Sequence, residues 1–175
     1  YLGVLIEKYK QSDIDNKDHE ILKIFSDYMN QLKNMPYDKV ELIWKFLCLD
    51  TLEMIQIDYN SFPEHRISFF ELVKSLIINE FDAVFKIQDQ NFNKNVINVI
   101  VWAFRHSQYN IAELGLDTLK FLLDGVNQAR LNGHNISDFF YKEYFMQLLN
   151  EIFVVLTDSF HKASFQQHVI IIQTL

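Results

Sequence analysis

The stretch that decides the fold is residues 109–129, which read YNIAELGLDTLKFLLDGVNQA. Its apolar side chains recur every three or four residues, which is the spacing of one face of an amphipathic α-helix. Similar patterns begin near Lys17 and Pro63, so the three starts lie about 46 residues apart, and a fourth begins near His161. A period of roughly 40–47 residues with two helices in each period is typical of HEAT-repeat solenoids.

This repeat predicts a single domain made of helix pairs at about 17–60, 61–107 and 108–158, with partial repeats at 1–10 and 159–175. A helix pair cannot bury its apolar face alone, so each pair must stack on its neighbours. We therefore predict an all-α HEAT-repeat superhelical solenoid. Both ends interrupt helical patterns, which predicts a fragment of a longer protein. The long surface of such a stack favours binding over catalysis.

The composition supports helices and limits the classes of partner. Four Gly and two Pro among 175 residues are few for a turn-rich β protein, and sixteen Phe supply much of the apolar surface for a core. The formal net charge of −7 argues against direct binding of nucleic acid, which requires clustered Lys and Arg. An acidic surface can still attract a basic protein partner.

Cys48 is the only cysteine, so no disulfide can form within the chain. This favours a reducing compartment, and the position of Cys48 on an apolar helical stripe predicts an inert core thiol. No signal peptide is visible. The sequence also lacks a run of 18 or more apolar residues, so we predict no membrane partner.

The start at Pro63 carries the clearest helix-start pattern. In Ser61-Phe62-Pro63-Glu64, Ser61 and Glu64 stand at capping-box spacing, and proline is tolerated in the first turn of a helix. Asp38 with Glu41 has the same spacing. Gly115 and Gly125 interrupt the helix that begins at Tyr109 and each lower its propensity by up to ~1 kcal/mol, which predicts a close approach of a neighbouring helix at these positions.

The helix expected at 91–106 presents the most interesting surface. One stripe at helical spacing is polar except for a tryptophan and consists of Asn91, Lys94, Asn95, Asn98, Trp102 and Arg105. The opposite face is apolar and consists of Phe92, Val96, Ile97, Ile100, Val101 and Phe104. Trp102 either packs on the next repeat or contacts a partner, since Trp and Arg are enriched in binding hot spots. The candidate partner-binding residues are Asn95, Asn98, Trp102 and Arg105.

The second helix of the following pair carries a matching polar stripe. Its members are Glu143, Gln147, Asn150 and Asp158. We expect these side chains to neighbour the stripe at 91–106 and to form one mixed polar surface.

No catalytic, cofactor-binding or metal-binding residue is predicted. His65 lies in a helix-start pattern with no nucleophile pattern beside it, so surface or inter-repeat hydrogen bonds explain it best. His161 and His168 stand seven residues apart, wider than the usual metal-binding pair. The acidic residues of the first pair read as solvated helix faces, and the four Gly are too scattered for a phosphate-binding loop.

Several stretches in a fixed order resemble one known family. They are Phe62-Pro63-Glu64-His65-Arg66, Phe69-Phe70, Trp102-Ala103-Phe104-Arg105-His106, Gly115-Leu116, Phe140-Tyr141, Ile152–Asp158 and His161. Their order and spacing over roughly residues 58–170 resemble the C-terminal part of the chromosome region maintenance (exportin-1) family of nuclear export receptors, in the importin-β superfamily.

The resemblance implies a ring-shaped HEAT solenoid that is not an enzyme. Such a receptor binds cargo with a leucine-rich nuclear export signal together with the GTP form of the small GTPase Ran. It passes nucleoporins in the nuclear pore and shuttles between nucleus and cytoplasm. In the family, the cargo groove and its reactive cysteine lie upstream of this region, so cargo would bind outside this chain, and Cys48 is not that cysteine.

Two other readings of the sequence remain open. A general HEAT scaffold, for instance in a phosphatase or vesicle-coat assembly, would bind partners without regard to the nucleotide state of a GTPase. A helical hydrolase or lyase that uses His65 or His106 would show a deep pocket with a perturbed pKa at one of these histidines.

Overall fold

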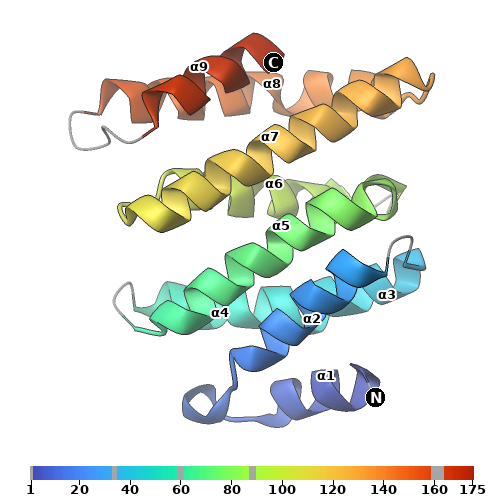
Figure 1. Cartoon of the computed structure of the whole chain (residues 1–175), viewed down its shortest axis with the longest axis vertical. Coiled ribbons are helices and arrows are strands. Elements are labelled where there is room, and N and C mark those ends of the chain that lie inside the picture. Colours follow the sequence, from blue (N-terminus) through green and yellow to red (C-terminus); the bar gives the residue numbers. More distant parts are fainter. Residues whose placement is uncertain (1, 33–34, 59–60, 87–89, 159–163) are drawn as a thin grey trace. The chain divides into compact units, whose positions relative to one another are not determined.

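The computed structural model describes residues 2–32, 35–58, 61–86, 90–158 and 164–175. All regular structure in these ranges is helical, which confirms the predicted all-α HEAT-repeat fold (Figure 1). The chain falls into two compact units, Tyr1–Gln88 and Asp89–Leu175. The boundary between the units lies inside the helix pair predicted at 61–107, and the division into three pairs stays a prediction.

The first unit packs its helices around a long central one. Its helices are α1 (Leu2–Gln11), α2 (Glu20–Gln31), α3 (Tyr37–Ile43), α4 (Leu49–Ile57) and α5 (Pro63–Lys86). The most extensive packing joins α2 to α5, which lie side by side in Figure 1. The core includes Leu22, Phe25 and Met29 of α2 and Phe69 and Leu72 of α5, all fully buried.

A π-helical turn, Trp44–Cys48, joins α3 to α4. This turn places Leu47 and Cys48 in the core, where both are fully buried, and α1 packs against it. The helix predicted from Asp38 therefore exists but is not a regular α-helix throughout. A π turn adds one residue to a helical turn, and sequence periodicity alone does not reveal it.

The first unit buries the charged side chains of Lys17, Arg66 and Glu80. The guanidinium of Arg66 is fully buried, and its Nη2 donates to the carbonyl oxygens of Ile55, Asp58 and Ser61 at 3.1–3.2 Å. These acceptors lie at and beyond the end of α4, where helical carbonyls lack intrahelical partners. Arg66 thus closes the C-terminal end of α4 from inside the unit.

Lys17 connects α1 to α4 in the same unit through two hydrogen bonds. Its Nζ donates to the Tyr9 carbonyl and to the Asp50 carboxylate, both at 2.6 Å, and its side chain is only 5% exposed. The Tyr9 hydroxyl lies 2.7 Å from the Thr51 hydroxyl. Burial raises the pKa of Tyr9 well above its usual range, so the phenol stays protonated.

The second unit consists of four helices: α6 (Gln90–Phe104), α7 (Tyr109–Leu131), α8 (Ile136–Thr157) and α9 (Phe165–Thr174). The long α7 packs on each of the other three. Its inner face buries Leu119, Leu122, Leu123 and Val126 completely. The predicted inward stripe of residues 109–129 is therefore confirmed, except that Leu114 is only half-buried.

Side chains about one repeat apart form hydrogen bonds within each unit. In the first unit, Ser26 bonds to Ser75, and Asn79 donates to Asn30, each pair 49 residues apart. In the second unit, Gln147 donates to Asn98 across 49 residues, and Gln167 donates to Asp117 across 50. These separations are close to the predicted period of about 46 residues.

The structure corrects several predicted helix starts. The helix expected from Lys17 begins at Glu20, because Lys17 has extended backbone at φ −66° and ψ 135°. Pro63 begins α5, but the capping box is wrong, since the Ser61 hydroxyl donates to the Asp58 carboxylate at 2.6 Å. The helix near His161 begins at Phe165, and His161 itself lies outside the described residues.

The pairing of Asp38 with Glu41 is also wrong as a capping box. Pro36 occupies the cap position of α3, and Asp38 lies inside the first turn. Pro36 has φ −56° and ψ 138°, so it remains extended and the helix begins at the next residue, Tyr37.

Candidate partner-binding surface

Helix α6 has the two faces that the sequence predicts. Phe92, Val96, Ile97, Ile100, Val101 and Phe104 are all buried. On the other side, Asn91, Lys94, Asn98 and Arg105 are exposed, and Asn95 and Trp102 are partly exposed. The structure therefore brings all four candidate residues to one accessible stripe of α6 and the turn that follows it.

The position of this stripe depends on a close contact between α6 and α7. A Cβ atom at Gly115 would lie 2.4 Å from the backbone nitrogen of Phe104 and 2.7 Å from two atoms of Ala103. These distances are shorter than real Cβ contacts, so only glycine fits without movement of α6. This confirms the close helix approach predicted at Gly115.

The stripe continues across to α8 through two polar contacts. Gln147 Nε2 donates to Asn98 Oδ1 at 3.0 Å, which confirms Gln147 as a neighbour of the stripe. Arg105 Nη1 donates to Glu151 Oε2 at 2.6 Å, and the two side chains are 45% and 26% exposed. An ion pair this exposed contributes little to stability, so Arg105 and Glu151 can each exchange the other for a group of a partner protein at little cost in free energy.

Trp102 lies between these two contacts along α6. Its ring meets the ring of His106 edge to face at a centroid distance of 6.0 Å. His106 is buried, and its Nδ1 accepts the Gln108 amide at 3.1 Å, which fixes the imidazole. A rigid, partly exposed indole between amide and guanidinium groups has the composition of a protein-binding hot spot.

Sequence analysis missed Glu151 as a member of this surface. It follows Gln147 by four residues, one turn further along α8, so extension of the same helical spacing would have found it. Glu143 and Asn150 of the predicted stripe are exposed on α8. Asp158 lies just beyond the helix, as its C-terminal cap residue.

His65 and His168 are held by hydrogen bonds to backbone carbonyls. Nε2 of His65 lies 3.0 Å from the Lys17 carbonyl, and a ring N–H donates to it, which confirms the predicted inter-repeat hydrogen bond. Burial lowers the pKa of His65. His168 is buried, with Nδ1 3.0 Å from the Ser164 carbonyl. The first unit has one groove between α1, α2 and α3 and another beside Glu80 of α5. Neither groove is lined by His65 or His106.

Cys48 is a buried thiol, as predicted, and burial raises its pKa far above the usual range. Within the described ranges, no three His, Cys, Asp or Glu side chains gather as metal ligands would. Among the helices that the structure describes, none has the length and hydropathy needed to cross a bilayer.

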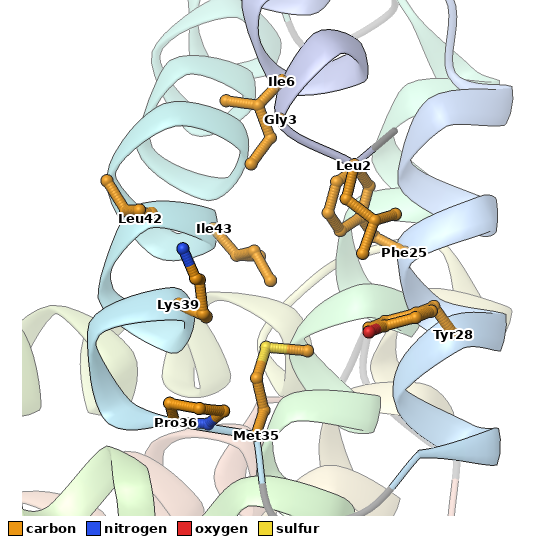
Figure 2. A pocket seen from close by; sticks show the side chains of 10 residues that line it. All are labelled: Leu2, Gly3, Ile6, Phe25, Tyr28, Met35, Pro36, Lys39, Leu42 and Ile43. Atoms are coloured by element: carbon orange, nitrogen blue, oxygen red, sulfur yellow. The ribbon is translucent and has the colours of Figure 1, made fainter.

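An apolar groove of about 590 Å³ opens in the first unit between α1, α2 and α3. Figure 2 shows Tyr28 and Phe25 of α2 on one side and Lys39 and Ile43 of α3 on the other, with Met35 between them. Lys39 carries the only ammonium group among the ten lining residues. None of the predicted partner-binding residues lies in this groove.

The fold and the stripe on α6 define a class of protein: an α-helical repeat protein with an accessible surface suited to binding. The family described as CRM1 C terminal matches residues 2–175, so the chain belongs to that family. The chain is 38% identical to Protein EXPORTIN 1A of Arabidopsis thaliana over 95% of its length. It is also 38% identical to Exportin-1 of Schizosaccharomyces pombe over 99% and 34% identical to Exportin-1 of Dictyostelium discoideum over 94%.

The chain spans 15–16% of the length of these relatives. The family resemblance expected from the sequence is therefore confirmed, and it extends over residues 2–57 as well as the part in which the quoted motifs lie.

Proposed function

We propose that this chain is part of a nuclear export receptor. The receptor binds cargo with a leucine-rich export signal together with the GTP form of Ran and carries it past nucleoporins through the pore, shuttling between nucleus and cytoplasm. The support is family membership over residues 2–175 and the name Exportin-1 of the relatives. Cargo binds outside this chain.

In this proposal the stripe on α6 contacts the GTPase. Asn95, Asn98, Trp102 and Arg105 offer amide donors and acceptors, an indole and a guanidinium on one accessible side of α6. A GTPase carboxylate can take over Arg105 from Glu151, because the exposed pair is weak and its exchange costs little free energy.

The chain acts by binding and not by catalysis. Receptor and GTPase work through coupled affinities: if the GTP form of Ran tightens cargo binding, cargo tightens Ran binding by the same factor. Helices stacked through buried contacts such as those of Gly115 transmit this coupling because packed cores change between discrete arrangements.

The decisive experiment uses the full-length receptor. A leucine-rich export peptide is titrated with Ran loaded with GTP and, in parallel, with GDP. The proposal requires the GTP form alone to tighten peptide binding, by roughly 5- to 150-fold if the coupling is typical. Equal peptide affinity with both forms would overturn it.

The same receptor tests the role of the stripe. Trp102→Ala with Arg105→Ala is expected to weaken Ran binding by about tenfold or more, as loss of hot-spot residues does. Thermal stability should change little, and Lys120→Ala, which removes an exposed charge from α7, serves as the matched control. Loss of stability with unchanged Ran binding would remove these residues from the site.

The second candidate function is a general HEAT-repeat scaffold for protein–protein interaction. The observation that favours it is the amide-rich, mixed-charge stripe, which carries no feature specific to one nucleotide state. This reading expects partners to bind equally in the presence of either form of the GTPase.

A further inference from the structure

The kink in α5 holds a carboxylate that its own unit does not fully satisfy. At Glu80 the backbone leaves the helical region, at φ −126° and ψ 26°. The side chain is 3% exposed, and Oε2 accepts the Met35 amide at 2.8 Å. Oε1 is buried and has no hydrogen-bond partner in the structure. Buried polar oxygens are nearly always paired, so Oε1 indicates a missing donor.

A groove of about 370 Å³ surrounds this carboxylate. It is lined by Met35, Tyr37, Ile78, Asn79, Glu80, Phe81, Asp82 and Ala83. Tyr37 is 62% exposed and Ile78 43% exposed, whereas Glu80 is 3% exposed, so the lining offers accessible carbon surface beside a buried carboxylate. Asp82 is exposed and places a second acidic side chain in the lining. Such a mixed lining fits a side chain with an aliphatic stem and a cationic head.

We propose that this groove binds an arginine side chain from a basic segment of a partner protein. The guanidinium donates to Oε1 of Glu80 after the carboxyl group, which is buried in the unbound chain, turns toward the groove. Guanidinium suits the site better than ammonium, because its planar face can stack on the Tyr37 ring while its edge donates to the carboxylate. The net charge of −7 draws basic segments toward the chain. The proposal is independent of the export function, since it uses none of the α6 stripe.

A neutral carboxyl is the competing explanation of the unpaired oxygen. Burial raises the pKa of Glu80, and the Met35 amide opposes that rise. A protonated Glu80 would carry no charge to attract a cation. The ionisation state of Glu80 and the binding of arginine must therefore be measured together.

The test is an NMR titration of the 175-residue chain at pH 7 with the tripeptide acetyl-Gly-Arg-Gly-amide. The Met35 amide, which bonds to Glu80, is the direct reporter. We expect saturable shifts at Met35 and at Ile78–Ala83, with an affinity on the order of millimolar for one side chain. The same peptide with citrulline in place of arginine has the same shape without the charge and should produce none.

Two variants with matched charge changes complete the test. Glu80→Gln keeps an oxygen for the Met35 amide and should weaken arginine binding by roughly tenfold. Glu71→Gln removes an exposed carboxylate from the same helix and should leave binding unchanged. Three results would each overturn the proposal. The citrulline peptide could produce equal shifts, or Glu80→Gln could bind arginine as tightly as the unchanged chain. The chemical shift of the Glu80 carboxyl carbon could also show that Glu80 is protonated at pH 7 while arginine does not bind.

Discussion

The two units share one architecture but stabilise it by different means. The first unit buries ionic and polar groups, with Arg66 bonded to three carbonyls and Lys17 bonded to Asp50. The second unit closes on apolar side chains and on the contact between Gly115 and α6, and the ion pair between Arg105 and Glu151 is partly exposed. Helix stacking therefore tolerates either kind of contact, provided that the helix faces fit.

This difference between the two units predicts where substitutions of charged residues are tolerated. A buried charge that loses its partners is costly, while an exposed pair contributes little. The buried charges of the first unit, Arg66 and Lys17, are thus required for stability, whereas the partly exposed pair of the second unit, Arg105 with Glu151, contributes little to it. Four substitutions and conditions test this contrast.

The largest effect is expected at Arg66. Arg66→Met keeps an unbranched chain of similar length but leaves the carbonyls of Ile55, Asp58 and Ser61 without their donor, which should lower the free energy of unfolding by about 3–5 kcal/mol. Urea denaturation followed by circular dichroism measures this change. Arg130→Met, at an exposed position of α7, is the control and should cost less than about 1 kcal/mol. Similar losses in both variants would contradict the contrast.

The next effect tests the apolar contact of the second unit. Gly115→Ala gains helix propensity, but its Cβ would lie 2.4 Å from the Phe104 nitrogen, so α6 must move. We expect a net loss of about 1–3 kcal/mol in the same assay. Gly3→Ala is the matched control, because nothing lies within 4 Å of that Cβ in α1, and it should stabilise by up to about 1 kcal/mol. A neutral Gly115→Ala would show that the close approach is not required.

The third effect is a dependence on pH through His65. Burial lowers its pKa in the folded state below the ordinary value of 6.5, so the folded chain binds this proton less readily than the unfolded chain. The contribution of His65 is therefore fully present above that ordinary value and is lost as the pH falls through the folded pKa. The difference in stability between pH 7.5 and pH 5 should shrink in His65→Gln, and an unchanged difference would exclude His65 as its source.

The smallest effect is expected at the exposed pair of the second unit. Glu151→Gln removes one charge next to Arg105 and should change the free energy of unfolding by less than about 1 kcal/mol. Thermal unfolding at low and high salt checks this, since screening should reduce the difference further. A loss as large as that of Arg66→Met would mean that both units depend on ionic contacts.

The helical content and the surface of α6 could be predicted because they depend on neighbours three or four residues away. The apolar side of α6, with Phe92 and Phe104, and the accessible side, with Asn98 and Trp102, follow from the 3.6-residue period. The capping boxes failed because another residue close in sequence competes at each of these helix starts. The Ser61 hydroxyl bonds to the Asp58 carboxylate, and Pro36 occupies the cap position of α3.

The sequence by itself determined the helical class, the repeat of about 46 residues and the family, since the period, the composition and the ordered motifs can all be read from the amino-acid order without knowledge of the packing. Only the tertiary structure decided that Arg66 and Lys17 are buried and bonded, that Glu151 joins Arg105, and that one carboxylate oxygen of Glu80 is buried without a partner at a kink. Most of these outcomes depend on side chains that are distant in sequence, such as Lys17 and Asp50 at 33 residues or Met35 and Glu80 at 45. The free energy of such contacts is set by burial and geometry, which exist only once the helices have packed.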